Sequence, residues 1–202
     1  MARGCTIICQ KLASITWILE NFADNIVNNQ YDNGSIPVTI PRTRYSRSTT
    51  PDSGWSDAGV IIPWTLWQMT GDTTEVKKVD PSMEKYMDLL YQKTGDTYRG
   101  PGSSYGDWLS FQRANVNGIS GANQILISDA YYAYDAKLMA QMARALGKTA
   151  DAEKYETLFT NIKKAFIKNY IVIDSDGRLT LLSGSRTPTR VKVITKTREY
   201  SK

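Results

Sequence analysis

The run GWSDAGVIIPWTLWQMT, residues 54–70, decides the fold class of this 202-residue chain. From Asp57 to Thr70 the side chains are apolar on nearly every side, which is typical of a helix surrounded by other helices. Gly71-Asp72 follows directly, and a glycine after the last apolar turn usually ends a helix. The sequence therefore predicts a buried, inner helix over residues 57–70.

Four further helical segments flank this one, and they are of two kinds. Residues 124–146 are again apolar nearly all round, whereas residues 12–29, 81–92 and 152–169 carry apolar side chains on one face only. A one-sided helix keeps its other face in water, so these three are expected to be outer helices. The order outer, inner, outer, inner, outer predicts an all-α fold of helical hairpins, with one ring of helices wrapped by another.

The connections between these helices differ in length. We expect short links at residues 71–80, where Asp80 caps an outer helix opened by Pro81, and at residues 147–150. The links over residues 30–56 and 93–123 are long and rich in Gly, Ser, Pro and Asp. Because successive helices alternate in direction, both long links should lie over the amino-terminal ends of the inner helices. Long loops are usually functional, so this end is the candidate site.

Two pairs of aromatic and acidic residues lie on the long links. Trp55 precedes Asp57 in the first link, and Asp107 precedes Trp108 in the second. Aromatic rings stack on the apolar face of a sugar, and carboxylates accept hydrogen bonds from its hydroxyls, so these residues are candidates for sugar binding. The alternatives are that Asp57 caps its helix and that each Trp is a packing residue.

Composition excludes several classes of mechanism. The chain has no histidine, which removes Ser-His-Asp and Cys-His nucleophile systems and the usual zinc sites, and we expect no metal or cofactor. The net charge is +5, but residues 178–202 hold seven basic residues and one acidic residue, so the remainder is close to neutral. No basic face with interleaved aromatics accompanies this tail, and no nucleic-acid partner is predicted.

The amino-terminal segment gives no sign of export or of membrane insertion. Cys5 and Cys9 are too few and too close together for a disulfide framework, so two free thiols are expected. The apolar stretch beside them is too short for a signal peptide, and no run of 18 apolar residues occurs in the chain. We therefore expect no membrane partner, and the cellular location stays open.

Several of these motifs together resemble a known family. They are DNGSIP (32–37), GWSDAGVIIPWTLW (54–67), GD (71–72), GDWL (106–109), AYYAY (130–134), LGK (146–148) and DGRL (176–179). This set resembles the catalytic domain of bacterial α-L-rhamnosidases, which are six-hairpin (α/α)6 glycoside hydrolases. The resemblance covers about Ile18 to Leu179 and implies a partial (α/α)6 toroid over residues 1–179, followed by a basic tail over residues 180–202.

The resemblance implies inverting hydrolysis of terminal α-L-rhamnose from glycosides by two carboxylic acids. The family's general acid lies in an Asp-Glu-Arg motif followed by Gly-Trp, upstream of the matched region, where this chain has only Glu20 and Asp24. Its general base lies in a later hairpin, and Glu199 has no matching surroundings. No catalytic residue is therefore assigned, and the resemblance leaves only the sugar-binding side of the site.

On that side, Trp55 and Trp108 match aromatics that wall the rhamnose site, and Asp57 and Asp107 belong to the same motifs. The expected partner is a rhamnose-containing glycoside, bound by a chain that is inactive alone. Six hairpins need two helices each, and the sequence predicts five helices, so exposed apolar edges should favour self-association. Two alternatives stay open: a carbohydrate-binding or assembly module completed by another chain, and a hairpin-repeat scaffold with no sugar site.

Overall fold

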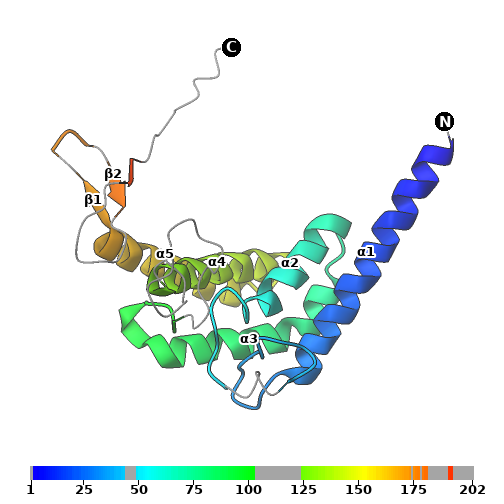
Figure 1. Ribbon diagram of the computed structural model, residues 1–202, viewed down its shortest axis with the longest axis horizontal. Coiled ribbons are helices and arrows are strands. Elements are labelled where there is room, and N and C mark those ends of the chain that lie inside the picture. The colour runs from blue at the N-terminus through cyan, green and yellow to red at the C-terminus, as the bar shows by residue number, and fades with distance from the viewer. Residues whose placement is uncertain are drawn as a thin grey trace, which may run out of the picture.

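Helices dominate the computed structural model, which describes residues 2–43, 49–102, 124–173, 175–177, 179–181 and 191–192 (Figure 1). They are α1 (Ala2–Asn29), α2 (Ala58–Thr70), α3 (Thr74–Thr94), α4 (Gln124–Ala145) and α5 (Thr149–Tyr170), with a short 3-10 turn, η2 (Gly95–Thr97). Helix α2 packs against α1, α3 and α4, and α4 packs against α3 and α5. The predicted alternation of inner and outer helices is therefore confirmed.

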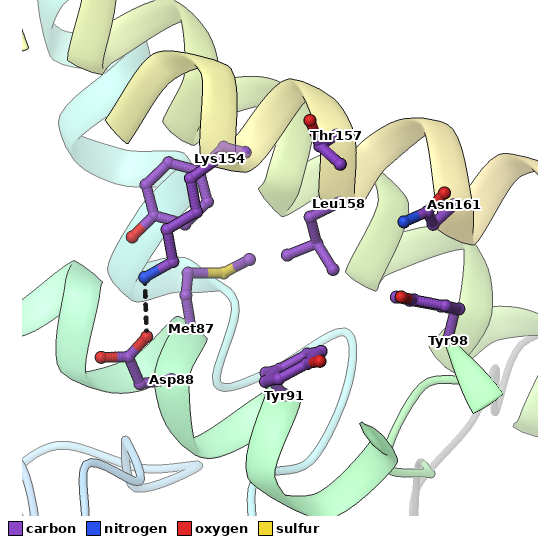
Figure 2. A pocket seen from close by; sticks show the side chains of 9 residues that line it. Met87, Asp88, Tyr91, Tyr98, Lys154, Thr157, Leu158 and Asn161 are labelled. Carbon is purple, nitrogen blue, oxygen red and sulfur yellow. Dashed lines mark hydrogen bonds and ion pairs between the residues drawn. The ribbon is translucent and has the colours of Figure 1, made fainter. Parts of the chain in front are cut away.

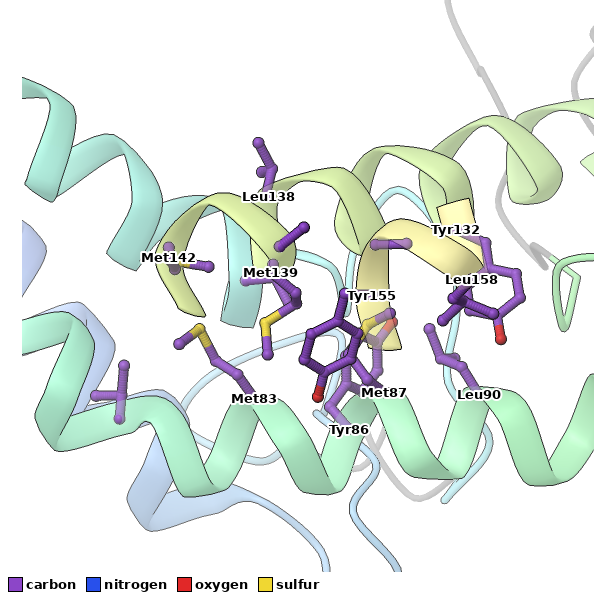
Figure 3. Packing of buried hydrophobic residues seen from close by; sticks show 14 of the residues in the cluster. Met83, Tyr86, Met87, Leu90, Tyr132, Leu138, Met139, Met142, Tyr155 and Leu158 are labelled. Carbon is purple, nitrogen blue, oxygen red and sulfur yellow. The ribbon is translucent and has the colours of Figure 1, made fainter. Parts of the chain in front are cut away.

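The core lies where α3, α4 and α5 converge (Figure 3). Its largest fully buried side chains include three tyrosines, Tyr86, Tyr132 and Tyr155, one from each of these helices. Four methionines fill the space between them, and their unbranched side chains suit irregular gaps between helices: Met83, Met87, Met139 and Met142. The same cluster continues through Ile36 and Val60 to Ala23 and Ile26, so it also holds the first long connection between α1 and α2.

Helix α3 begins earlier than the sequence predicts. We expected Asp80 and Pro81 to open it, but it starts at Thr74, and Pro81 lies inside it. Val76 and Val79 are 1% and 2% exposed and continue the buried stripe of α3 towards its amino terminus, which stabilises the turns before the proline. Asp80 is not a cap, because it lies inside α3; it is buried, and its carboxylate pairs with Lys148 in the turn between α4 and α5.

Helix α1 exposes much of the apolar stripe that the sequence predicts. Its end nearest α2 is packed, with Ala23 and Ile26 buried. Ile15, Ile18 and Phe22 are 45%, 56% and 41% exposed, although the periodicity places them on the same stripe. Figure 1 shows why: the amino-terminal turns of α1 project beyond the other helices, so the described residues leave this part of the stripe uncovered.

A small antiparallel sheet follows α5, a feature that the all-α prediction does not include. Its strands are β1 (Ile171–Ile173), β2 (Leu179–Leu181) and β3 (Val191–Lys192), in the order β1-β2-β3. Ile171 pairs with Leu181, so β1 and β2 form a hairpin. Gly177 has a φ of 77° in the turn between them, a conformation that glycine adopts without steric cost. Strand β3 and most of β2 lie in the segment expected to be a separate tail.

Candidate functional site

The loop that carries Trp55 is a tight turn held by its own residues. Gly54 has a φ of 89°, which disfavours any side chain at this position. Its N–H donates to Oδ2 of Asp57 at 2.5 Å, and the Trp55 and Ser56 N–H groups both donate to the carbonyl of Asp52, at 3.1 and 2.9 Å. The backbone on both sides of Trp55 is therefore fixed.

Two further residues of the same motif attach this turn to the first long connection. Ser56 Oγ donates to the carbonyl of Ile36 at 2.7 Å and accepts the N–H of Asp52 at 3.1 Å. At Gly59, a Cβ atom would lie 2.1 Å from Cδ1 of Ile36, which is closer than any real contact. Glycine at this position lets the Ile36 side chain pack directly against the first turn of α2, so the motif attaches the first long connection to this helix.

Asp57 lies beneath this turn and is 1% exposed. It occupies the N-cap position of α2 without making a side-chain cap bond to the helix. Its Oδ1 instead accepts a hydrogen bond from the hydroxyl of Tyr86 at 2.8 Å, and its Oδ2 accepts that of Gly54. The structure thus places Asp57 below the surface, between the turn and α3.

A second buried carboxyl group, that of Asp135 on α4, faces Asp57. Asp135 is 0% exposed, and neither of its oxygens accepts a hydrogen bond from the N–H or O–H groups that the structure describes. Burial, and then the charge of Asp57, raise the pKa of Asp135 well above its usual value. Burial also raises the pKa of Asp57, while hydrogen bonds oppose that rise. Of the two carboxyl groups, Asp135 therefore favours the protonated form more strongly, because no described hydrogen bond stabilises its charge.

Trp55 is the surface residue of this arrangement, with 42% of its area exposed. The ring of Tyr131, on α4, lies beside the same turn, since a Cβ atom at Gly54 would be 3.6 Å from it. Sequence reasoning did not single out Tyr131 or Asp135 as site residues. The two residues are four positions apart and share one face of α4. The presence of a carboxylate on an otherwise apolar helix could have identified this face as part of a site.

The described ends of the two long connections meet next to this turn. The N–H of Ser53 donates to the carbonyl of Gly102 at 3.2 Å, and the hydroxyl of Ser53 bonds that of Ser128 on α4 at 2.8 Å. Gly102 N–H also donates to Ser128 Oγ at 2.8 Å. The described ends of the two connections thus lie together at one end of the inner helices, as predicted.

A charged network fixes the chain just before Gly102. Arg99 donates to Oδ2 of Asp129 at 2.7 Å and to the hydroxyl of Tyr170 at 2.6 Å. Tyr170 also donates to Asp129, and the N–H of Gly100 donates to the other carboxylate oxygen at 2.6 Å. Asp129 is 1% exposed and lies in the first turns of α4. The guanidinium and these hydrogen bonds balance its buried charge.

Asp107 and Trp108, the second predicted pair, lie outside the described residues, so their distance from Trp55 stays a prediction. Within the described ranges, no group of three or more Cys, Asp and Glu side chains is arranged to hold a metal ion. No helix among these residues is long and apolar enough to span a bilayer.

Several known proteins are similar to this chain in sequence and in the arrangement of their helices. The sequence pattern described as the bacterial alpha-L-rhamnosidase 6 hairpin glycosidase domain matches residues 6–197. An alpha-L-rhamnosidase of Formosa agariphila is 32% identical over 146 residues, which are 72% of this chain and 15% of that protein. Another, from Streptomyces avermitilis, is 39% identical over 127 residues, covering 63% of this chain and 11% of that one.

Solved structures agree with these matches. An alpha-L-rhamnosidase from Dictyoglumus thermophilum superimposes with a TM-score of 0.66 at 31% identity, over 76% of this chain and 17% of the other. The Streptomyces avermitilis enzyme, solved in complex with L-rhamnose, gives a TM-score of 0.61 at 33% identity, over 78% and 14% of the two chains. This chain therefore spans less than a fifth of these relatives. It belongs to the bacterial α-L-rhamnosidase six-hairpin glycosidase domain family.

Proposed function

We propose that this chain forms part of the sugar-binding wall of an α-L-rhamnosidase-type site. In this proposal Trp55 is the aromatic platform on which a terminal L-rhamnose of a glycoside stacks, and Asp57 positions the platform from below. The observation that carries the proposal is the way the turn is built: a 42% exposed Trp55 on backbone that is fixed on both sides. A pre-organised aromatic ring loses little conformational entropy when it binds a ligand.

We propose further that the chain binds the sugar without hydrolysing it by itself. Inverting hydrolysis needs an acid and a base on either side of the scissile bond, about 6.5–9.5 Å apart, and both must reach the substrate or its water. The four carboxyl groups described around the Trp55 turn are at most 5% exposed: Asp52, Asp57, Asp129 and Asp135. Groups this deeply buried favour a positioning role over proton transfer to a substrate.

Two measurements on the purified chain test this pair of statements. L-rhamnose titrated against the tryptophan fluorescence should give a saturable change that Trp55→Ala removes. Trp17→Ala is the matched control, because Trp17 is 65% exposed on α1 and should leave the titration unchanged. A flat titration would contradict sugar binding. Steady release of rhamnose from an aryl α-L-rhamnoside, abolished by one carboxylate substitution, would contradict the lack of hydrolysis.

A second candidate function is assembly, and the uncovered face of α1 favours it. Ile15, Ile18 and Phe22 are between 41% and 56% exposed and lie on one face of the helix, within about two turns. An apolar patch of this kind on a soluble domain commonly marks an interface. Here the proposed interface is with a second copy of this chain, each copy covering the α1 face of the other.

Sedimentation velocity over a range of concentrations tests this assembly. The chain should shift to a larger species as concentration rises, and Ile18→Glu should hold it as a monomer. Ile167→Glu is the control, because Ile167 is 43% exposed on α5, away from α1. A chain that stays monomeric at every concentration would refute assembly and would leave the sugar-binding proposal unaffected.

A further inference from the structure

A groove of about 270 Å³ separates the outer helices α3 and α5 (Figure 2). Its floor is apolar, formed by Met87 and Leu158, which are 1% and 9% exposed. Tyr91 of α3 and Tyr98, the residue after η2, stand at its border, and Figure 2 shows both rings nearly edge-on, with open space between them and α5. The groove therefore offers aromatic faces to an occupant.

Polar side chains surround this aromatic floor. At one end Lys154 of α5 pairs with Asp88 of α3, their Nζ and Oδ1 atoms 3.0 Å apart. Asn161 lies on the opposite side, beyond Leu158, where its amide carries both a donor and an acceptor. Because the two charges of the pair offset each other, the groove presents polar groups with little net charge.

The backbone holds one of these rings in an uncommon conformation. Tyr98 has a φ of 51°, the single non-glycine residue in the left-handed region among those described. Its N–H donates to the carbonyl of Gly95 at 3.2 Å, which closes the short turn after α3. Left-handed conformations of bulky residues are sparsely populated and concentrate at ligand sites. This turn directs the Tyr98 ring to the end of the groove.

We propose that this groove binds a single neutral pyranose ring, as a second sugar site on the outer face of the hairpins. An aromatic face stacks on the C–H side of a pyranose, while Asn161 and the Lys154–Asp88 pair have the donors and acceptors that its hydroxyls require. The volume lies just below the range of about 300–1,000 Å³ found for drug-sized ligands, which suits one sugar ring. The site is separate from the Trp55 turn and goes beyond the proposed function.

The charge of Lys154 distinguishes this occupant from the main alternative. Several tyrosines beside a carboxylate also form cages for quaternary ammonium ions. Here Lys154 neutralises Asp88, and its ammonium group also lies 5.3 Å from the centre of the Tyr155 ring. A cationic ligand would meet this positive charge at the site, whereas a neutral sugar would not.

Chemical-shift mapping on the full chain tests the proposal directly. Methyl α-L-rhamnoside and methyl α-D-glucoside are the probes, and binding should shift the amide signals of Tyr91, Tyr98 and Asn161 in the unmodified protein. Tyr91→Ala should weaken the affinity about tenfold, a loss of the order expected for one aromatic stacking partner. Tyr91→Phe keeps the ring and should keep the affinity.

Two controls separate this site from the others. Ile167 lies on α5 outside the groove and is about as exposed as Tyr91, so Ile167→Ala should leave the affinity for the glycosides unchanged. Trp55→Ala should leave the groove shifts intact even where it abolishes the fluorescence titration, so the two proposals fail independently. Shifts produced by choline in place of the glycosides, shifts confined to the Trp55 turn, or no shift at millimolar glycoside would each overturn the proposal.

Discussion

Replacing Asp135 by asparagine tests the buried carboxyl pair beneath the Trp55 turn. The pKa of Asp135 is raised by burial and by the charge of Asp57. The folded chain therefore holds a proton on this group at pH values where the unfolded chain, with a pKa of about 3.9, has lost it. Folding then becomes less favourable as the pH rises from the unfolded pKa to the folded one.

The magnitude follows from the proton linkage. Each pH unit in this interval costs the unmodified chain about 1.4 kcal/mol of unfolding free energy. An asparagine side chain has nearly the same shape and stays neutral at every pH, so Asp135→Asn removes the slope that Asp135 contributes. The variant should therefore gain about 1.4 kcal/mol relative to the unmodified chain for each pH unit between the unfolded and the folded pKa of Asp135.

Urea unfolding followed by circular dichroism at a series of pH values measures this difference. Asp57→Asn is the informative companion, because Asp57 accepts the hydrogen bonds of Gly54 and Tyr86 and its variant should be less stable at every pH. Stability curves for the unmodified chain and Asp135→Asn that stay parallel above the unfolded pKa would refute a raised pKa at Asp135. A harmless Asp57→Asn together with a damaging Asp135→Asn would reverse the assignment.

Three further variants test the packing around the same turn. Gly59→Ala places a Cβ atom 2.1 Å from Cδ1 of Ile36, which is 2% exposed, and should cost about 1–3 kcal/mol in a chemical denaturation experiment. Tyr86→Phe removes the hydroxyl that donates to Asp57 and should lower the unfolding free energy by about 1.5–3 kcal/mol; an unchanged midpoint would contradict that bond. Lys148→Ala removes a 40% exposed ammonium from its buried partner on α3, so a loss of about 1 kcal/mol is expected, and salt should reduce it.

Most of the fold could be predicted from the helical periodicity of the sequence. Five helices, their order and their inner or outer character could be predicted because a buried helix and a half-exposed helix differ in every turn. The start of α3 could not, because a proline is ordinarily a boundary signal. Burial of Val76 and Val79 stabilises the helical turns before Pro81, and this tertiary packing cannot be inferred from local helix propensity. The strands after α5 are only two or three residues long, too short for a pattern.

The turn that carries Trp55 could be recognised from the sequence, but the environment of its carboxyl group could not. The Gly-Trp-Ser-Asp-Ala-Gly motif identified the turn, and the long connections indicated which end of the helices it occupies. The pKa of Asp57 depends in part on Asp135, which lies 78 positions further along the chain and comes close to it only once α2 and α4 pack. The roles of buried charges depend on such distant partners, and short-range patterns do not contain them.

The hairpin of α4 and α5 is held at both of its ends. Lys148 ties the turn between the two helices to Asp80 and Glu84 of α3, and at the far end Arg99 joins Asp129 of α4 to Tyr170 of α5. Two helices fastened in this way cannot fray from either end, so their amides should exchange with deuterium as one cooperative unit. Amides in the projecting turns of α1 should exchange earlier, so the rate of hydrogen exchange should differ between α1 and the α4–α5 hairpin.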